Sequence, residues 1–230
     1  MTARPPVAPP EEDPNVEILC ASPPCFMHEL DPAWLGLPLS WEEVRTWRRA
    51  ERETLIARRA AVPLAERRAR DLLITAHLRA ALPDLANRHI GFYWPFRGEY
   101  DPRPLVRALH REGARLALPV VVQRARPMEF RPWQPGARMA KGIWDIPVPA
   151  EGAPVQPDTL LVPLVGFDAR GYRLGHGGGY YDRTLAAMPR RPRAIGIGFE
   201  GLRLPTIHPQ PHDIPMDMIV TERGAMEVAP

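Results

Sequence analysis

Residues 161–183, with the sequence LVPLVGFDARGYRLGHGGGYYDR, run from a buried strand through a turn and a glycine-rich loop directly into a helix. Small residues let backbone N–H groups approach a ligand closely, and a helix N-terminus favours negative charge. In an open α/β sheet such a loop lies beyond the carboxyl ends of the strands, where ligands bind. The segment therefore predicts phosphate binding, and the alternative is a tight turn that binds nothing.

The rest of the chain alternates between strand and helix patterns in a way that supports this placement. Two helices are expected first, over residues 41–60 and from Pro63 to about residue 81. Strands are expected over residues 89–94, 115–122, 128–133, 159–165, 194–199 and finally 218–221, with helices over 104–111 and 180–188. This alternation predicts a three-layer α/β/α fold with a mostly parallel, Rossmann-like open sheet.

Length and composition fit one folded domain with an extension. The 230 residues are 45% hydrophobic, which is enough for one good-sized α/β domain over residues 40–226. Residues 1–39 are Pro-rich, and we expect this extension to be partly disordered. No stretch approaches the roughly 18 apolar residues of a membrane span, and residues 1–15 do not resemble a signal peptide. We therefore expect a cytoplasmic protein that does not bind a membrane.

The charged residues indicate an anionic ligand. The formal net charge is +3, and Lys141 is the only lysine, so the basic groups are almost all arginines, which bind phosphate and carboxylate bidentately. Nucleic acid is the alternative partner. However, the arginines of residues 45–70 alternate with acids and apolar residues at helical spacing, which favours a solvated helix face. Cys20 and Cys25 indicate neither a disulfide framework nor a metal site, so we expect free thiols.

The residues around the glycine-rich loop favour a nucleotide over an empty turn. Arg173 places a cation two residues before the loop, and Tyr180, Tyr181 and Asp182 follow it directly. An aromatic pair suits a flat heterocycle, and a carboxylate beside phosphates suits Mg²⁺. The loop is not a Walker A motif, because no Gly-Lys-Ser/Thr sequence closes it.

The pattern FD-x-x-G-x-RLG-x-GGGYYDR resembles the signature of the 5-formyltetrahydrofolate cyclo-ligases, also called methenyltetrahydrofolate synthetases. Residues 48–67 resemble the basic N-terminal helix of that family, and residues 212–222 resemble its closing HD-x-x-x-D-x-IVTE stretch. The resemblance covers about residues 41–222. The matching positions in the signature are Asp168, Gly171, Arg173, Leu174, Gly175, Gly177, Gly179, Tyr180, Tyr181 and Asp182.

The resemblance implies an activity. The family converts 5-formyltetrahydrofolate and ATP to 5,10-methenyltetrahydrofolate, ADP and phosphate, through phosphorylation of the formyl oxygen and attack by N10. Such phosphoryl transfer needs positioning and charge neutralisation more than a protein nucleophile. The sequence agrees, because it contains no obvious Ser/His/Asp or Cys/His triad. We expect a monomer that acts on this small-molecule substrate, with ATP as co-substrate and Mg²⁺ as cofactor, and that binds no nucleic acid.

The resemblance also implies roles for individual residues. Arg173 and Tyr180 are the expected catalytic residues, and Asp182 and Asp213 are the expected Mg²⁺ residues. Arg48 stands where the family has a lysine, although the neighbouring Arg49 is an alternative match to that lysine. The expected folate contacts are Trp94, Glu99, Trp144, His176 and Tyr180. The expected ATP contacts are Arg48, Arg52, Arg173, Leu174, Gly175, His176, Gly177, Gly178, Gly179, Tyr180 and Tyr181.

Simpler interpretations remain open at this point. Trp144 could be a core residue, Glu99 a solvated loop acid and Asp213 a helix cap or turn residue. Asp168 is as easily a turn former as a ligand and is left out of the metal site. Another enzyme class on a related architecture, a sugar-phosphate isomerase or a CoA-transferase-like protein, would also place a glycine loop at phosphates, without needing ATP. A nucleic-acid-binding module would require steeply salt-dependent binding.

Overall fold

The computed structural model describes residues 39–229, and the expected extension therefore lies almost wholly outside the described residues. Residues 41–230 form one compact unit. Within the part that the structure describes, no helix is long and apolar enough to cross a membrane.

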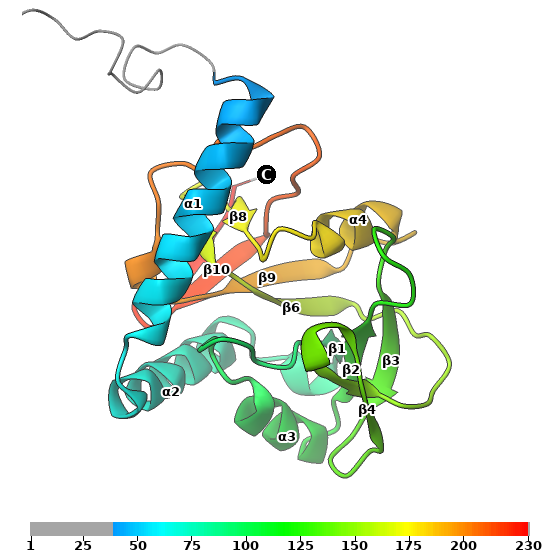
Figure 1. Ribbon diagram of the computed structural model, residues 1–230. Coiled ribbons are helices and arrows are strands. Elements are labelled where there is room, and N and C mark those ends of the chain that lie inside the picture. The colour runs from blue at the N-terminus through cyan, green and yellow to red at the C-terminus, as the bar shows by residue number, and fades with distance from the viewer. Residues whose placement is uncertain (1–38, 230) are drawn as a thin grey trace, which may run out of the picture. The chain divides into compact units, whose positions relative to one another are not determined.

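A seven-stranded sheet forms the centre of this unit, in the order β11-β10-β9-β6-β1-β2-β3 (Figure 1). The five inner strands, from β10 to β2, are parallel, whereas β3 and β11 pair antiparallel at the two edges. The strands are β1 (His89–Gly91), β2 (Arg115–Val120), β3 (Glu129–Trp133), β6 (Thr159–Pro163), β9 (Arg193–Ile197), β10 (Met218–Thr221) and β11 (Gly224–Glu227). This arrangement confirms the predicted α/β class and the mostly parallel sheet.

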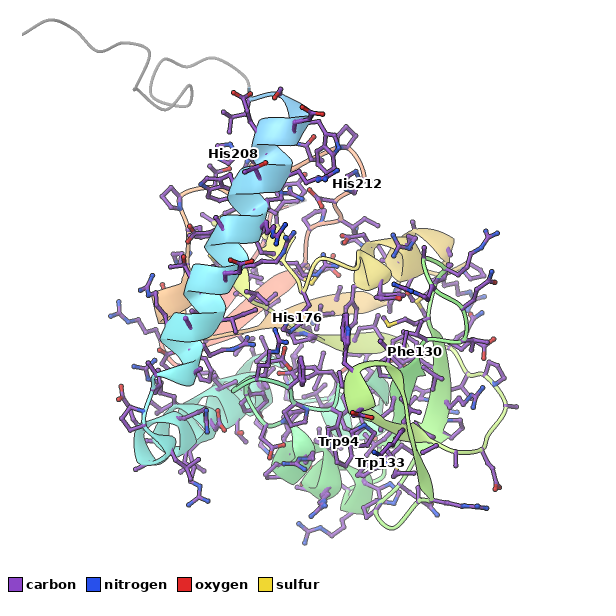
Figure 2. The ribbon with its side chains drawn as sticks, viewed as in Figure 1. Trp94, Phe130, Trp133, His176, His208 and His212 are labelled. Carbon is purple, nitrogen blue, oxygen red and sulfur yellow. The ribbon has the colours of Figure 1, made fainter. Side chains whose placement is uncertain are left out.

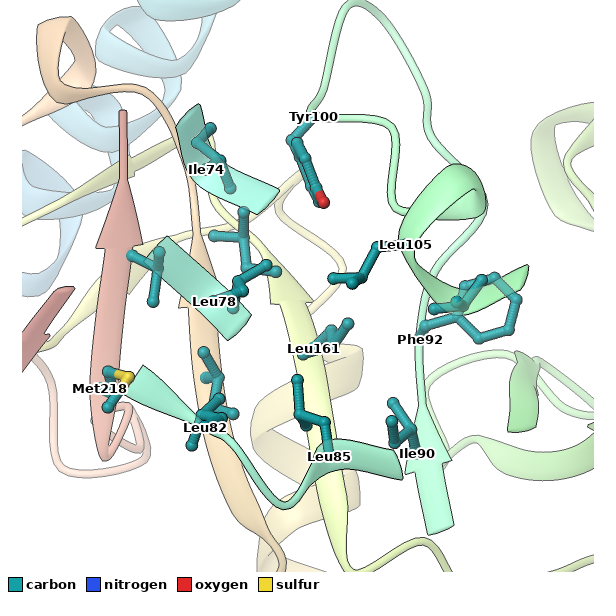
Figure 3. Close-up of a cluster of buried hydrophobic side chains, with 14 of the residues drawn as sticks. Ile74, Leu78, Leu82, Leu85, Ile90, Phe92, Tyr100, Leu105, Leu161 and Met218 are labelled. Atoms are coloured by element: carbon teal, nitrogen blue, oxygen red, sulfur yellow. The ribbon is translucent and has the colours of Figure 1, made fainter. Parts of the chain in front are cut away.

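Helices cover both faces of the sheet, because its inner strands are apolar on both sides. Leu161 packs with α2 (Leu64–Ala81) and α3 (Arg103–Arg111) on one face, as Figure 3 shows for Ile74, Leu78 and Leu105. The neighbouring Leu160 and Val162 belong to a second cluster, on the face covered by α4 (Tyr180–Ala187). Since successive strand residues point to opposite faces, a continuous apolar strand such as β6 must be covered twice.

Helix α1 (Trp41–Ala60) passes the carboxyl ends of the strands and has an unusual buried stripe (Figure 1). Its buried residues are Val44, Arg48, Leu55 and Arg59, so two arginines lie on the face that packs against the domain. The expectation of a solvated arginine face is therefore wrong for these two positions. Both guanidinium groups are buried because they bind loops at the ends of the strands, as described below.

The long elements lie close to where the sequence predicts them, and the short ones were missed. The strand predicted over 218–221 is present, but the expectation that it is the last strand is wrong, because β11 follows it. The strand predicted over 89–94 ends already at Gly91. Strands and turns of two or three residues have too few positions for a periodic pattern. The missed elements are β4 (Met139–Lys141), β5 (Pro147–Pro149), β7 (Gly166–Phe167), β8 (Arg173–Leu174) and the 3₁₀ turns Leu85–Asn87, Ile143–Asp145 and Glu200–Leu202.

Asp71 on α2 is a half-buried acid with one carboxylate oxygen, Oδ1, that is itself buried and has no hydrogen-bond partner among the described residues. Burial, with a smaller contribution from the nearby charge of Asp101, raises the pKa of Asp71 to about 6, although the hydrogen bond from the Asp101 backbone and the charge of Arg67 oppose the shift. A folded-state pKa above the unfolded value means that the folded protein binds more protons between about pH 4 and pH 6, so stability falls as the pH rises through this window.

We predict that Asp71→Asn raises the melting temperature at pH 8, because the amide removes a charge that burial disfavours. The gain over the wild type should shrink as the pH falls from 8 toward 4, since Asp71 of the folded wild type becomes protonated. Thermal unfolding at several pH values measures both effects. The exposed Glu53→Gln on α1 serves as the control and should show no such trend, and an equal gain at every pH would contradict the prediction.

Candidate active site

A cavity of about 960 Å³ lies at the carboxyl ends of the parallel strands. It is enclosed by α1, the segment after β1, the β4–β5 hairpin, the loop from β8 to α4 and residues 211–214. The structure brings every predicted site residue to this one cavity: Arg48, Arg52, Trp94, Glu99, Trp144, Arg173, Leu174, Gly175, His176, Gly177, Gly178, Gly179, Tyr180, Tyr181, Asp182 and Asp213. Which ligand each of them contacts stays a prediction.

The glycine-rich loop depends on backbone geometry that other residues adopt with difficulty. Gly177 has φ +93°, and Gly179, which caps α4, has φ +61°. A Cβ atom at Gly179 would also lie 3.0 Å from the Arg183 guanidinium, which donates a hydrogen bond to the Gly178 carbonyl. The left-handed conformation and the close approach of Arg183 together explain why the segment needs small residues here.

Two arginines of α1 reach this loop and the segment beside it. The Nη2 atom of Arg48 donates to Asp213 Oδ2 at 2.5 Å, and its Nε donates to the Ile207 carbonyl at 3.0 Å. Arg52 donates from Nε to the Gly175 carbonyl at 2.9 Å. The terminal nitrogens of Arg52 have no partner among residues 39–229, and burial, together with the positive charge of Arg48, lowers the pKa of Arg52. A half-buried guanidinium with free donors is suited to binding an anion.

Two of the three acids that line the cavity, Asp182 and Asp213, are each paired with an arginine that also lines it. Asp182 Oδ1 accepts hydrogen bonds from Arg173 Nη1 at 3.0 Å and from the Ile214 amide at 3.1 Å. Asp213 is bound by Arg48 through both carboxylate oxygens. No group of three or more His, Cys, Asp or Glu residues able to hold a metal occurs in the described part of the chain. The donors therefore suit a magnesium ion that keeps waters and phosphate oxygens among its ligands, and they do not form an all-protein cage.

The opposite wall of the cavity combines an acid with aromatic rings. Glu99 is 7% exposed, accepts a hydrogen bond from the Phe96 amide at 2.9 Å, and lies 2.9 Å from His176 Nε2. Trp144, at φ +56° in the β4–β5 hairpin, is 54% exposed, and its ring is stacked within 9° of parallel to that of Phe96. Glu99 is thus not a solvated loop acid, and Trp144 is not a core residue.

Three histidines lie near α1 in different settings (Figure 2). His176 belongs to the glycine-rich loop and faces the cavity. His208 and His212 contact the N-terminal half of α1, where their rings meet Trp47 and Trp41 edge to face. His176 is therefore the histidine that links the glycine-rich loop to Glu99.

Asp168 takes the turn-forming role that was the alternative to ligand binding. Its Oδ1 atom accepts hydrogen bonds from the Arg170 and Tyr172 amides, and its Oδ2 atom accepts one from the Ile207 amide. The residue is 1% exposed and does not line the cavity. Asp168 therefore lies outside the candidate site.

The residues around the site that were not predicted from the sequence include Phe96, Arg183 and Arg59. Phe96 and Arg183 line the cavity, and Arg59 lies behind Glu99 with its guanidinium 3.8 Å from that carboxylate. Phe96 could have been noticed as an aromatic residue three positions before Glu99. Nothing in the sequence distinguishes Arg59 from its exposed helical neighbours such as Arg58.

These features define a class of protein. It is an α/β protein with a cavity at the strand ends, in which a glycine-rich loop surrounded by arginines faces a wall of aromatic rings and one acid. The model of the 5-formyltetrahydrofolate cyclo-ligase family matches residues 44–222. The chain therefore belongs to this family and is an enzyme of that class, which confirms the resemblance seen in the sequence.

Individual relatives agree with this assignment. The chain is 29% identical over 180 residues to the 5-formyltetrahydrofolate cyclo-ligase of Mycolicibacterium smegmatis, covering 75% of this chain and 92% of the relative. It is 32% identical over 145 residues to that of Escherichia coli K12, covering 60% and 80%. The NMR structure of Aquifex aeolicus 5,10-methenyltetrahydrofolate synthetase superposes with a TM-score of 0.70 at 28% identity, covering 80% of this chain and 93% of that chain.

We predict that Asp213→Asn lowers the free energy of unfolding by about 1–3 kcal/mol at pH 7, because it weakens the hydrogen bonds of a buried guanidinium. Burial raises the pKa of Asp213, but the hydrogen bonds from Arg48 and the Gln210 amide outweigh it and hold the pKa below its usual value. The stabilisation is therefore present at neutral pH and is lost as the pH falls through that lowered pKa.

Urea unfolding of wild type and variant at pH 7 and near pH 3 tests this. The difference should be largest at pH 7 and should shrink as the pH falls below the usual aspartate pKa of about 4. Glu53→Gln, which alters an exposed pair with Arg49 at 3.5 Å, is the matched control and should change the unfolding free energy by less than about 0.5 kcal/mol. Equal stability of Asp213→Asn and wild type at pH 7 would contradict the prediction.

Proposed function

We propose that the enzyme catalyses the ATP-dependent cyclisation of 5-formyltetrahydrofolate to 5,10-methenyltetrahydrofolate, with release of ADP and phosphate. Membership of the cyclo-ligase family supports the reaction. The observation that favours the ATP-dependent form is the single cavity in which Arg52 and the glycine-rich loop, a phosphate-binding arrangement, face Glu99 and the rings of Phe96 and Trp144. A phosphorylated donor and a flat heterocycle could meet there without leaving the protein.

The chemistry requires both substrates to be bound side by side. The formyl oxygen is a poor leaving group, so it attacks the terminal phosphorus of ATP, forming a new O–P bond while the bond to ADP breaks. N10 then attacks the activated formyl carbon, the C–O bond breaks, phosphate leaves and the N10 proton is released. Each step depends on alignment and on neutralisation of phosphate charge, which positioned arginines and backbone amides provide.

On the nucleotide side, Arg173 and the backbone of residues 175–179 would hold the phosphates of ATP. Arg48 and Arg52 would add positive charge from α1, with Arg52 better placed because its terminal nitrogens have no partner in the described part of the chain, whereas Arg48 is bound to Asp213. Tyr180, at the start of α4, would contact both nucleotide and folate together with His176.

Magnesium would be held by Asp182 and Asp213, directly or through water, and would supply charge neutralisation at the phosphates. Asp182 is the better placed of the two. Only its Oδ1 atom is engaged among the described residues, so its second oxygen has no partner there, whereas Arg48 occupies both oxygens of Asp213.

On the folate side, Glu99 would accept hydrogen bonds from the N–H groups of the pterin ring. Its buried carboxylate already accepts from His176 and from the Phe96 amide, which fixes its direction. Trp94 and Trp144 would contact the flat rings of the substrate, as their place in the lining of the cavity allows.

The test of this function is the formation of methenyltetrahydrofolate, followed by its absorbance, in the presence and absence of ATP. We expect product only when 5-formyltetrahydrofolate, ATP and Mg²⁺ are all present, with one ADP released for each product molecule. Product without ATP, or ATP hydrolysis that does not depend on the folate, would contradict the proposal.

We predict that Asp182→Asn lowers turnover at least about tenfold, equivalent to roughly 1.4 kcal/mol of barrier, and raises the Mg²⁺ concentration needed for half-maximal rate. If Asp182 serves only as a favourable charge at the start of α4, the change should cost about 0.3–1 kcal/mol of stability and leave turnover intact. Titration of the rate with Mg²⁺ separates the two. Asp84→Asn, an exposed carboxylate outside the cavity, is the control, and normal turnover with normal Mg²⁺ dependence in folded Asp182→Asn would refute the assignment.

A further inference from the structure

Arg59, in the last turn of α1, is a buried cation that no step of the proposed reaction uses. The residue is 2% exposed and does not line the cavity. Its Nε atom donates to the Arg97 carbonyl at 3.0 Å, and its Nη1 atom donates to the Leu164 carbonyl, just beyond β6, at 3.0 Å. Arg59 thus joins a helix, a strand end and the turn that precedes Glu99.

The third nitrogen of Arg59 faces the carboxylate. Nη2 is buried, has no hydrogen-bond partner among the described residues, and lies 3.8 Å from Glu99 Oε1. The side chains of Arg59 and Glu99 are 1% and 4% exposed. Because water screens such a pair only weakly, the guanidinium stabilises the ionised carboxylate, and its removal would leave a buried charge uncompensated.

The turn that Arg59 binds has a conformation that needs support. Arg97 has φ +47° and Gly98 has φ +77°, so two successive residues adopt left-handed backbone. For a non-glycine residue such as Arg97 this geometry is disfavoured, and the hydrogen bond from Arg59 to the Arg97 carbonyl opposes that cost. This turn also fixes Glu99, whose Oε2 atom accepts a hydrogen bond from the Phe96 amide.

We propose that Arg59 is a positioning residue for the folate half of the site. It does not touch substrate; it holds the turn at Arg97 and the ionised carboxylate of Glu99, so that Glu99 presents a fixed acceptor to the substrate ring. This inference rests on the proposed function, because it assigns the wall around Glu99 to folate and the glycine-rich loop to ATP.

A purely structural role for Arg59 makes a different prediction. Loss of a general packing contact would lower the stability of the protein and would weaken the binding of both substrates together. Loss of a positioning contact should raise KM for 5-formyltetrahydrofolate while KM for ATP stays nearly constant, since the ATP side is held by Arg48 and Arg52. The split between the two KM values is therefore the informative readout.

The experiment uses Arg59→Met, which keeps the length of the side chain, and Arg59→Lys, which keeps the charge but loses the fork of donors. We expect Arg59→Met to raise KM for 5-formyltetrahydrofolate by about tenfold or more, and KM for ATP by less than about twofold. Arg59→Lys should lie between Arg59→Met and wild type. Arg58→Met, at the neighbouring exposed position, is the matched control and should match wild type.

A double-mutant cycle with Glu99→Gln decides whether Arg59 acts through Glu99. In the Glu99→Gln background, changing Arg59 should raise KM for 5-formyltetrahydrofolate by less than about threefold, because the contact that Arg59 supports is already lost. The inference would be overturned if the KM increases of the two single variants multiplied in the double variant, or if KM rose equally for both substrates. If Arg59→Met does not fold, the same cycle with Arg59→Lys gives the same decision.

Direct binding separates this inference from the proposed reaction. The affinity of each protein for 5-formyltetrahydrofolate and for ATP is measured by calorimetry alongside the rates. A wild type that binds 5-formyltetrahydrofolate without converting it would contradict the proposed reaction, while the Arg59–Glu99 cycle could still be read from the dissociation constants. A wild type that binds no 5-formyltetrahydrofolate would overturn both.

Discussion

Three arginines along one side of α1 are the constraint on which the site depends. Arg48, Arg52 and Arg59 are spaced by four and seven residues, so they lie along one side of the helix. Each binds a different segment: Arg48 binds residues 207–213, Arg52 binds the Gly175 carbonyl, and Arg59 binds the turn at Arg97. No β-ladder joins these segments to one another. Their relative positions therefore depend largely on the stiffness of one helix and on hydrogen bonds from charged donors, which are stronger than neutral ones.

The same arrangement sets the electrostatic character of the cavity. Its acids are already neutralised, since Asp182 faces Arg173, Asp213 faces Arg48 and Glu99 faces Arg59. The guanidinium of Arg52, which forms no ion pair among the described residues, and the backbone of the glycine-rich loop add positive potential. A cavity of this kind attracts a polyanion while keeping one carboxylate available for ring N–H groups. Pairing of the acids thus favours anion binding without removing acidic side chains from the site.

The sequence predicts those parts of this structure that depend on local pattern. The helices and the central strands follow from hydrophobic periodicity, and the glycine-rich segment follows from its composition and from its resemblance to a family. Arg59 could not be predicted, because its partners are backbone carbonyls 38 and 105 residues away, and in the sequence it resembles its exposed neighbour Arg58. The β4–β5 and β7–β8 pairs were missed for a related reason: their few residues pair because the tertiary fold brings them together.

His176 connects the two halves of the cavity through one hydrogen bond. It belongs by sequence to the glycine-rich loop, whose Gly175 carbonyl is held by Arg52, yet its ring donates to Glu99 on the opposite wall. Glu99 is in turn held by Arg59, so α1 contacts both ends of this chain of hydrogen bonds. A transfer between two bound molecules requires that the reacting atoms stay within a few tenths of an ångström of alignment, and a misplacement of about 1 Å can cost about a hundredfold in rate. A helix that fixes both walls at once, with an imidazole bridging them, meets that requirement more directly than two independently folded loops could.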